Sequence, residues 1–325
     1  MESLAFALNK TLPIVVMILI GYFIKRVGIF TADVAKVVNG VVFRVLLPGM
    51  LFYNIYNIKS LGGISLNFVW YVLAFTIGLF LIFIPIVNML FPIKNQRGVI
   101  LQSIFRSNYA LVGLPLAEAL FGSEGVQVAS LLSAFIIPAF NILGVICLCI
   151  YNDDKKVNIK SILLNIAKNP LIIGVCTGLV ALGIRAIFVK TNIDFRLTDI
   201  EAVDTILVYL KSAATPMALL ALGAQFEFSA IPELKKQIGF GIALRSVIVP
   251  ISALTAAYFM GIFNGAHFAA FVAMFATPVA VSTVPMCQSM GADHKLAGQL
   301  VVWTTLISSI VIFLASLILK AIGIF

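Results

Sequence analysis

Charged residues are scarce in this chain. Of its 325 residues only 11% are charged, whereas 62% are hydrophobic, and the mean hydropathy is +1.12. A soluble domain carries roughly 25% charged residues, so this sequence has too little polar surface to cover a water-soluble globule. Its apolar runs have the length of about 20 residues that a membrane-spanning helix needs. The composition therefore predicts an all-α, polytopic membrane protein.

Residues with catalytic or metal-binding chemistry are also few. The chain has two histidines and four cysteines, and all four cysteines lie in apolar runs without the spacing of metal ligands. It contains no G-x-S-x-G, H-E-x-x-H or P-loop motif. We therefore expect neither an enzyme nor an ATP-driven pump, and neither a metal site nor a cofactor.

The excess of basic residues has a simple explanation in a membrane protein. The net charge is +9 and the isoelectric point is near 9.4. Cytoplasmic loops of membrane proteins are enriched in Lys and Arg, so we assign the excess to these loops and expect the lipid bilayer, not nucleic acid, as the partner. Lys and Arg gather in the loops that follow the odd-numbered spans. This bias predicts a multi-pass protein of the cell membrane with the 151–168 loop in the cytoplasm and both termini outside.

The apolar runs divide the chain into two similar halves. About ten spans are expected, near 5–24, 37–57, 66–91, 98–121, 126–150, 169–188, 202–224, 238–262, 266–290 and 297–319. The stretch 158–168 has the pattern of a short interfacial helix. Residues 1–151 and 152–325 then hold five spans each. Because five is odd, the second half enters the membrane from the opposite side, which predicts two inverted five-helix repeats.

Proline and glycine recur at matching places in the two halves. The matched pairs are Pro13 with Pro170, Gly21 with Gly178, Pro48 with Pro216, and Pro115 with Pro285. The last pair lies in apolar segments rich in small and polar residues, at 107–122 and 277–292. A helix break in a membrane is costly unless the freed backbone groups face a cavity, a ligand or packed protein. Broken spans at equivalent positions of two repeats indicate a transporter's binding site, here in spans four and nine.

The first broken segment carries the more specific chemistry. Arg106 either snorkels to the interface or contacts a carboxylate, as a substrate partner or as the counter-charge of Glu118. Asn108 is the main candidate for binding a substrate carboxylate, because its amide donates hydrogen bonds beside the amides of a new helix. Glu118 is either a proton carrier or a solvated residue at the outer end of the span. The remaining site candidates of this segment are Tyr109, Gly113 and Pro115, with the break expected at Leu114–Pro115.

The second broken segment is lined by hydroxyl groups. Its site candidates are Thr277, Pro278, Ser282, Thr283 and Pro285, with Gln288 as a further polar candidate for coupling. We expect at least one hydroxyl of Ser282 and Thr283 to face the site, whereas Thr277 can simply bind a carbonyl freed by the break. Further basic or polar positions inside the spans are Asn54, Asn141, Lys211, Gln225 and Arg245.

The segment FRSNYALVGLPL, Phe105 to Leu116, resembles the auxin efflux carrier family, whose bacterial members are often called malate permeases. The resemblance extends to LLPGMLF, at 46–52, and to ATPVAVSTVPMCQSMG, at 276–291. It implies a scaffold domain and a transport domain, each built from both repeats, with the substrate where spans four and nine cross. The crossover asparagine and proline of the family fall on Asn108 and Pro115. In the second crossover, Pro278 stands where plant members have an asparagine.

Together these features predict a secondary carrier of small organic anions, such as malate or auxin-like carboxylates, that works by alternating access. A coupling proton or sodium ion is also expected, and the resemblance implies a homodimer. Two alternatives remain open from the sequence: a sodium-coupled symporter of the related bile-acid type, and a membrane sensor that uses the fold without transport.

Overall fold

The computed structural model describes residues 2–58, 66–152, 159–193 and 195–325. Within these ranges every regular element is a helix, and the only strand-like pairing is an isolated bridge between Ser107 and Val279. Seven helices in the searched part of the chain are long and apolar enough to cross a membrane: Asp33–Tyr56, Leu66–Leu90, Gln127–Ile150, Pro170–Lys190, Glu201–Gln225, Ile231–Met260 and His294–Ala321. The prediction of an all-α, polytopic membrane protein is therefore confirmed.

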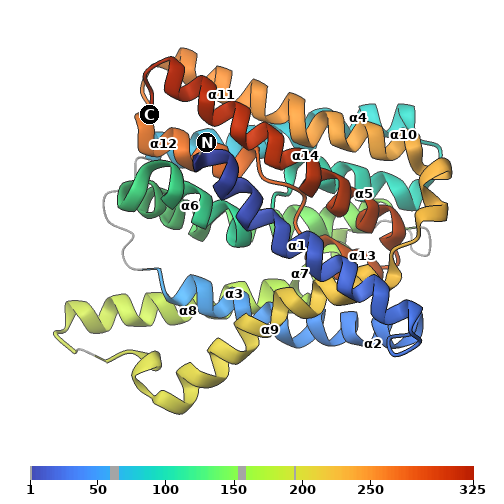
Figure 1. Cartoon of the computed structure of the whole chain (residues 1–325). Coiled ribbons are helices and arrows are strands. Elements are labelled where there is room, and N and C mark those ends of the chain that lie inside the picture. Colours follow the sequence, from blue (N-terminus) through green and yellow to red (C-terminus); the bar gives the residue numbers. More distant parts are fainter. Residues whose placement is uncertain (1, 59–65, 153–158, 194) are drawn as a thin grey trace.

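The helices form two layers (Figure 1). We call the first the α9 layer; it contains α2 (Ala32–Val41), η1 (Val42–Leu46), α3 (Leu47–Tyr56), α8 (Pro170–Lys190), η3 (Leu197–Asp199) and α9 (Glu201–Gln225). We call the second the α6 layer; it contains α4 (Leu66–Leu90), α5 (Lys94–Phe105), η2 (Tyr109–Gly113), α6 (Leu114–Ile150), η4 (Phe228–Ala230), α10 (Ile231–Ile242), η5 (Ala243–Ile248), α11 (Val249–Met260), α12 (Gly265–Phe275), α13 (Thr283–Ser289) and α14 (His294–Ala321). Two helices join the layers: α1 (Glu2–Arg26) packs on α9 and α14, and α7 (Ile159–Lys168) packs on α6 and α8.

Glycines bring α1 close to α9 and α8 close to α3. A Cβ at Gly21 of α1 would lie 2.2 Å from the carbonyl oxygen of Leu220 in α9. A Cβ at Gly178 of α8 would lie 3.2 Å from the backbone of Phe52 in α3. Small residues at such contacts let membrane helices approach closely, where van der Waals packing holds them together. Gly21 and Gly178, which occupy matching places in the two halves of the sequence, thus allow the same kind of close packing, of α1 against α9 and of α8 against α3.

Three π-helical segments stand directly before prolines. These segments, η1, η2 and η5, are followed by Pro48, Pro115 and Pro250, each at the second position of the next α-helix. A proline has no N–H to donate and its ring crowds the carbonyl four residues earlier. The wider π turn accommodates both effects without ending the helix.

The long helix α6 contains a sharp change of direction. Phe121 and Gly122 have non-helical backbone angles, and Gly122 has φ 58° and ψ −147°. Only glycine adopts this combination without strain. The change falls where the sequence placed the boundary between two spans, at 121–126.

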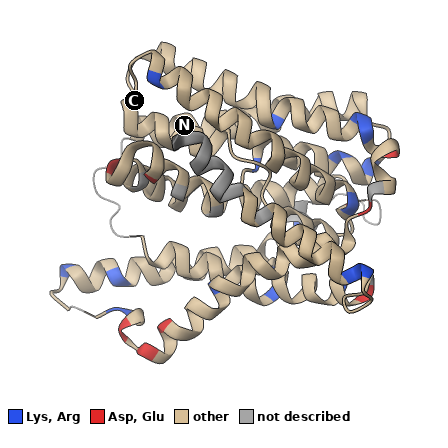
Figure 2. Ribbon diagram, viewed as in Figure 1, with Lys and Arg blue, Asp and Glu red and all other residues tan. Residues whose placement is uncertain are grey.

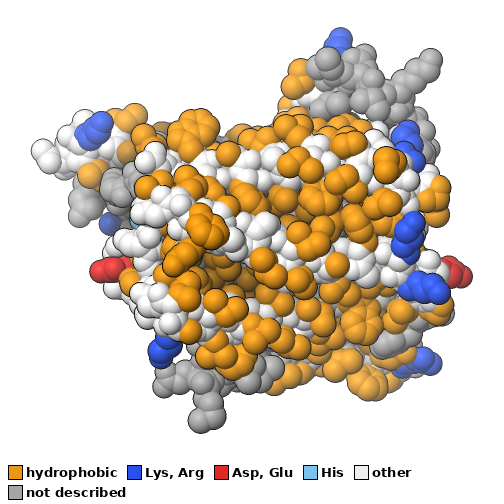
Figure 3. Space-filling model, turned by 90° about the horizontal axis from the view of Figure 1, so that it is seen from above, with side chains coloured by type: hydrophobic (Ala, Val, Ile, Leu, Met, Phe, Trp, Pro, Cys, Tyr) orange, Lys and Arg blue, Asp and Glu red, His pale blue; other side chains and the backbone are white. Residues whose placement is uncertain are grey.

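The surface agrees with a bilayer environment. Acidic and basic residues lie mainly towards the two ends of the helices (Figure 2), and apolar side chains cover the face in Figure 3. Large side chains such as Trp70, Met89 and Phe259 are exposed on these outer faces. Apolar side chains of this size are stable on a surface that lipid chains cover.

Candidate functional site

Both candidate spans are interrupted, and the first break lies at a different place from the one expected. In the first, α5 ends at Phe105, Arg106 is extended with φ −93° and ψ 106°, and the chain becomes helical again at Tyr109. The predicted break at Leu114–Pro115 is therefore wrong: Pro115 lies in the first turn of α6, next to the π-helical η2. Its side chain lies outside the part that the structure describes.

In the second span, Pro285 also lies after the break and not within it. The helix α12 ends at Phe275 and α13 begins at Thr283, so Pro278 lies in the break, and Pro285 lies in the first turn of the new helix. The N–H groups of a first turn have no partner within the helix, so a proline there costs little. Neither Pro115 nor Pro285 thus lies in a break: Pro115 lies inside the helical stretch that resumes at Tyr109, and Pro285 lies in the first turn of α13.

The two breaks cross each other as a short antiparallel pair. The backbone N–H of Asn108 donates to the carbonyl of Pro278 over 2.8 Å, and that of Ala280 donates to the carbonyl of Arg106 over 3.4 Å. A third bond runs from the Val279 N–H to the hydroxyl of Thr304 in α14, over 3.1 Å. Backbone groups inside a membrane must be satisfied by the protein itself, and this pairing meets that need.

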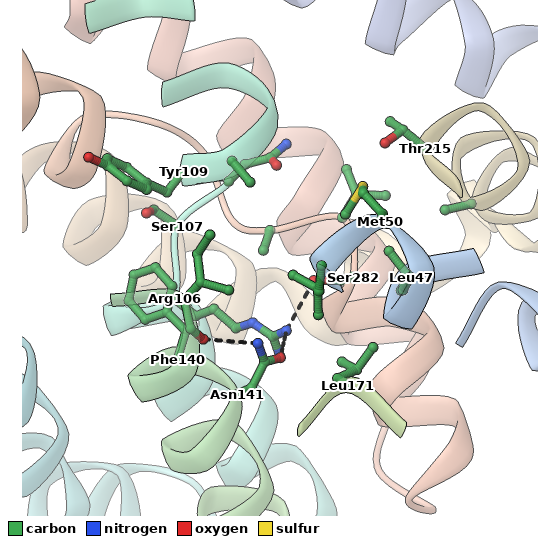
Figure 4. Close-up of a pocket in the computed structure, with 17 residues that line it drawn as sticks. Leu47, Met50, Arg106, Ser107, Tyr109, Phe140, Asn141, Leu171, Thr215 and Ser282 are labelled. Carbon is green, nitrogen blue, oxygen red and sulfur yellow. Dashed lines mark hydrogen bonds between the residues drawn. The ribbon is translucent and has the colours of Figure 1, made fainter. Parts of the chain in front are cut away.

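A cavity of about 60 Å³ lies beside the crossing, between the two layers (Figure 4). A volume of this kind accommodates roughly two water molecules, at about 30 Å³ each, or a small polar group of a ligand. The α6 layer supplies its polar wall: Arg106, Ser107, Asn108, Asn141 and Ser282. The α9 layer supplies a mainly apolar wall: Leu47, Met50, Leu51, Leu171, Thr215 and Ala218.

Arg106 supplies the charge of this cavity. Its side chain is buried, with 3% of its surface exposed. One terminal nitrogen donates to Gln102 Oε1 and Met286 Sδ, both at 2.7 Å. The other donates to Asn141 Oδ1 at 3.0 Å and Ser282 Oγ at 3.1 Å (Figure 4). All four partners are neutral.

No carboxylate pairs with Arg106 among the described residues, and the ion pair between Lys295 and Glu227 lies at the surface. Glu118, the expected counter-charge, is exposed on α6 and does not line the cavity. The predictions that Glu118 is the counter-charge of Arg106 and that it belongs to the site are therefore wrong. A buried cation without an anion is expensive in a membrane protein.

Asn108 offers a second donor to the same cavity. Its side chain is buried, and its Nδ2 atom has no hydrogen-bond partner. On the opposite wall, the buried Oγ1 of Thr215 also lacks a partner. Leaving a buried polar group unpaired costs about 1–3 kcal/mol, which a ligand that supplies the partner recovers.

Two other candidates of the first segment have structural contacts. The Tyr109 ring lines the cavity, but its hydroxyl points away from Arg106 and donates to the carbonyl of Ala129 at 2.7 Å (Figure 4). Gly113 packs against α12, where an added Cβ would lie 2.8 Å from the carbonyl oxygen of Ala273. These residues shape the crossing and do not present polar atoms to the cavity.

Of the three candidate hydroxyl groups in the second segment, one faces the cavity and two do not. Ser282 faces the cavity and contacts Arg106, as described above. Thr283 is fully buried outside the cavity lining, and its hydroxyl has no partner. Thr277 donates to the carbonyl of Ala273 at 2.8 Å, in the manner of a residue that caps a broken helix. Gln288 lies farther along α13 and accepts from Asn39 of α2 at 2.8 Å, so it joins the two layers.

A second buried arginine binds the carbonyl groups that the breaks set free. Arg245 of η5 has no exposed surface. It donates to the carbonyls of Thr277 at 2.8 and 2.9 Å, Met274 at 2.8 Å and Ile104 at 3.3 Å. Arg245 thus contacts the carboxyl ends of both α5 and α12.

Several residues of the site were not predicted from the sequence. Gln102 and Met286 bind Arg106, and Thr215 of α9 lines the same cavity. Gln102 could have been found, because it lies four residues before Arg106 on the same helix face. Met286 and Thr215 come from distant parts of the chain and have no local signal.

The comparisons with known proteins agree with a membrane transporter. A family model described as "Membrane transport protein" matches residues 6–316. An uncharacterized transporter of Methanocaldococcus jannaschii is 27% identical over 317 residues, which cover 94% of this chain and 97% of that protein. An uncharacterized transporter of Methanothermobacter thermautotrophicus is 23% identical over 327 residues, covering 96% and 98% of the two chains.

Proposed function

This chain belongs to the membrane transport protein family, and we propose that it is a secondary carrier of small organic anions. The family match confirms the resemblance to the auxin efflux carriers. The observation that carries the proposal is the buried Arg106, which faces a cavity and has no carboxylate partner among the described residues. A substrate carboxylate would bind this guanidinium and the free Nδ2 of Asn108.

The charge of the cavity favours a substrate with one negative charge. Arg106 is the one charged side chain among the described residues of its lining, and most of the opposite wall is apolar. A second carboxylate would lie against Leu47, Met50 or Leu171, where a bare charge is costly. Monocarboxylates such as auxin-like acids meet this condition directly. A dicarboxylate such as malate meets it once it carries a proton.

Alternating access is supported by the position of the cavity between the layers. The α6 layer would act as the transport domain and the α9 layer as the scaffold, with residues 1–151 and 152–325 as inverted repeats. Two observations support this division. The α1–α9 contact at Gly21 and the α8–α3 contact at Gly178 are equivalent under an exchange of the repeats. The two breaks also pair with each other, as two inverted segments would.

Location in the cell membrane, cytoplasmic placement of the 151–168 loop and external termini complete the proposal. They rest on the distribution of Lys and Arg among the loops. Within that loop, residues 153–158 lie outside the described part of the chain. A homodimer through the scaffold rests on the family resemblance.

The structure offers an argument against the sodium-coupled alternative. A sodium site in a broken helix would use the carbonyls that the break sets free. Here Arg245 already binds those of Ile104, Met274 and Thr277. Its guanidinium therefore occupies the place of the cation.

Uptake into proteoliposomes tests the proposal. We would measure accumulation of radiolabelled indole-3-acetate and of radiolabelled malate under a proton gradient, a sodium gradient and neither. Carrier function predicts uptake of at least one acid, lost in Arg106→Gln. Sodium dependence would favour the symporter, and binding without uptake under every gradient would favour the sensor.

A further inference from the structure

Arg245 lies at the junction of the two broken spans. Its guanidinium contacts three backbone carbonyls and is completely buried. Ile104 belongs to the last turn of α5, Met274 to the last turn of α12, and Thr277 to the break itself. The side chain comes from η5, a separate span, so one residue ties three segments of the chain together.

The acceptors of Arg245 are the negative ends of two helices. The last carbonyls of a helix have no partner within it, and together they behave like about half a negative charge. Two helix ends converge here, so their sum approaches one negative charge near the proposed anion site. Without a nearby cation, this charge would oppose a carboxylate at Arg106.

We propose that Arg245 is a positioning residue for the anion site. Its hydrogen bonds hold the ends of α5 and α12 in register at the crossing. Its charge offsets the two carbonyl ends, so that the charge of Arg106 remains available to the substrate. This inference rests on the proposed function, because it assigns Arg245 a role in the affinity for an anion.

Arg185 is a matched control for the same type of contact elsewhere. Its guanidinium also binds the end of a helix, donating to the carbonyls of Tyr56 at 3.0 Å and Ile58 at 3.4 Å. Those carbonyls end α3 in the α9 layer, and Arg185 does not line the cavity beside the crossing. Arg185→Gln therefore removes an arginine from a helix end without changing the crossing.

The first experiment needs no ligand. Hydrogen–deuterium exchange of the purified protein in detergent would be followed in segments 104–110 and 274–282. We expect Arg245→Gln to speed exchange in both segments by about tenfold or more, as expected for loss of charge-assisted hydrogen bonds. Arg185→Gln should leave them unchanged. Equal exchange in the two variants would overturn the role of Arg245 at the crossing, whether or not the protein transports anything.

The second experiment distinguishes the electrostatic effect of Arg245 from its role in holding the two helix ends together. Binding of indole-3-acetate and of its neutral amide, indole-3-acetamide, would be measured for the wild type, Arg245→Lys and Arg245→Gln. Lysine keeps the charge, whereas glutamine keeps hydrogen-bond donors but loses it. We expect Arg245→Gln to weaken acid binding about tenfold more than amide binding, and Arg245→Lys to preserve the ratio.

The possible failures are distinct. If both variants weaken the acid and the amide equally, Arg245 only supports the structure and the electrostatic role is wrong. If the wild type binds neither probe, the proposed substrate class fails, and the exchange measurement still decides whether Arg245 holds the crossing.

Discussion

The two breaks of this protein have the same backbone plan and opposite chemistry. Each is followed by helical chain that contains a proline, Pro115 after η2 and Pro285 in the first turn of α13, and the two breaks pair with each other. At the first break, Arg106 and Asn108 direct their side chains to a cavity. At the second, the carbonyls bind Arg245 and the Thr277 hydroxyl binds Ala273. The prolines therefore locate the two spans that cross. The side chains within each break show which of the two breaks presents the cation and the free amide to the cavity.

The largest effect that tests this contrast is expected from Arg106→Gln. The variant loses the one cation of the cavity, so we expect affinity for a carboxylate to fall about 100-fold, the range for hydrogen bonds to charged groups. Because the charge has no anionic partner, its removal should leave the melting temperature unchanged or raise it. Binding and thermal unfolding of the purified protein would measure both. Lys211→Gln, which removes an exposed cation that stacks over Tyr53, is the control. A large loss of stability with unchanged affinity would mean that Arg106 is a structural residue.

Asn108→Ala should have the next largest effect. It removes a buried amide whose Nδ2 is free to bind the substrate, so affinity should fall about tenfold. The control is Ser107→Ala, since Ser107 also lines the cavity but its hydroxyl donates to the sulfur of Met274 at 3.7 Å, whereas the Asn108 Nδ2 has no partner. Isothermal titration with the transported acid would compare them. Unchanged affinity in Asn108→Ala would remove this residue from the site.

Thr277→Val should affect stability more than binding. Its hydroxyl donates to the carbonyl of Ala273, so its loss should lower the free energy of unfolding by about 1 kcal/mol. Affinity should stay within about threefold, because the hydroxyl does not line the cavity. Chemical unfolding and binding would be measured on the same preparation. A loss of affinity larger than that of Asn108→Ala would reverse the contrast between the two breaks.

The smallest effect is expected from Pro285→Ala. Since Pro285 lies in the first turn of α13, its replacement removes no hydrogen bond, and the free energy of unfolding should change by less than about 1 kcal/mol. Uptake should match the wild type. A variant that folds normally but no longer transports would show that the proline itself serves the site.

The sequence predicted the larger features of the molecule well. Its apolar runs and their breaks follow from hydropathy and proline content, which are local properties, and they placed both breaks on the correct spans. The position of the first break was predicted wrongly. Pro115 is accommodated by the π-helical turn before it, and no sequence pattern predicts that turn. The surroundings of Arg106 were also unpredictable. Met286 and Asn141 reach Arg106, and Thr215 reaches the same cavity, only through the tertiary packing of distant segments.

Glu118 illustrates the remaining difficulty. In a membrane protein both the lipid-facing and the core-facing sides of a helix are apolar, so periodicity does not assign a side chain to one of them. Glu118 and Arg106 lie in the same stretch of sequence, yet one is exposed and the other is buried beside the cavity.

The most direct measurement is a structure with a bromine-labelled carboxylate bound, in which anomalous scattering locates the ligand. The account predicts the carboxylate between the layers, with an oxygen about 2.7–2.9 Å from a terminal nitrogen of Arg106 and a hydrogen bond from Asn108 Nδ2. A ligand bound elsewhere, with Arg106 still paired only to Gln102, Asn141, Ser282 and Met286, would contradict it.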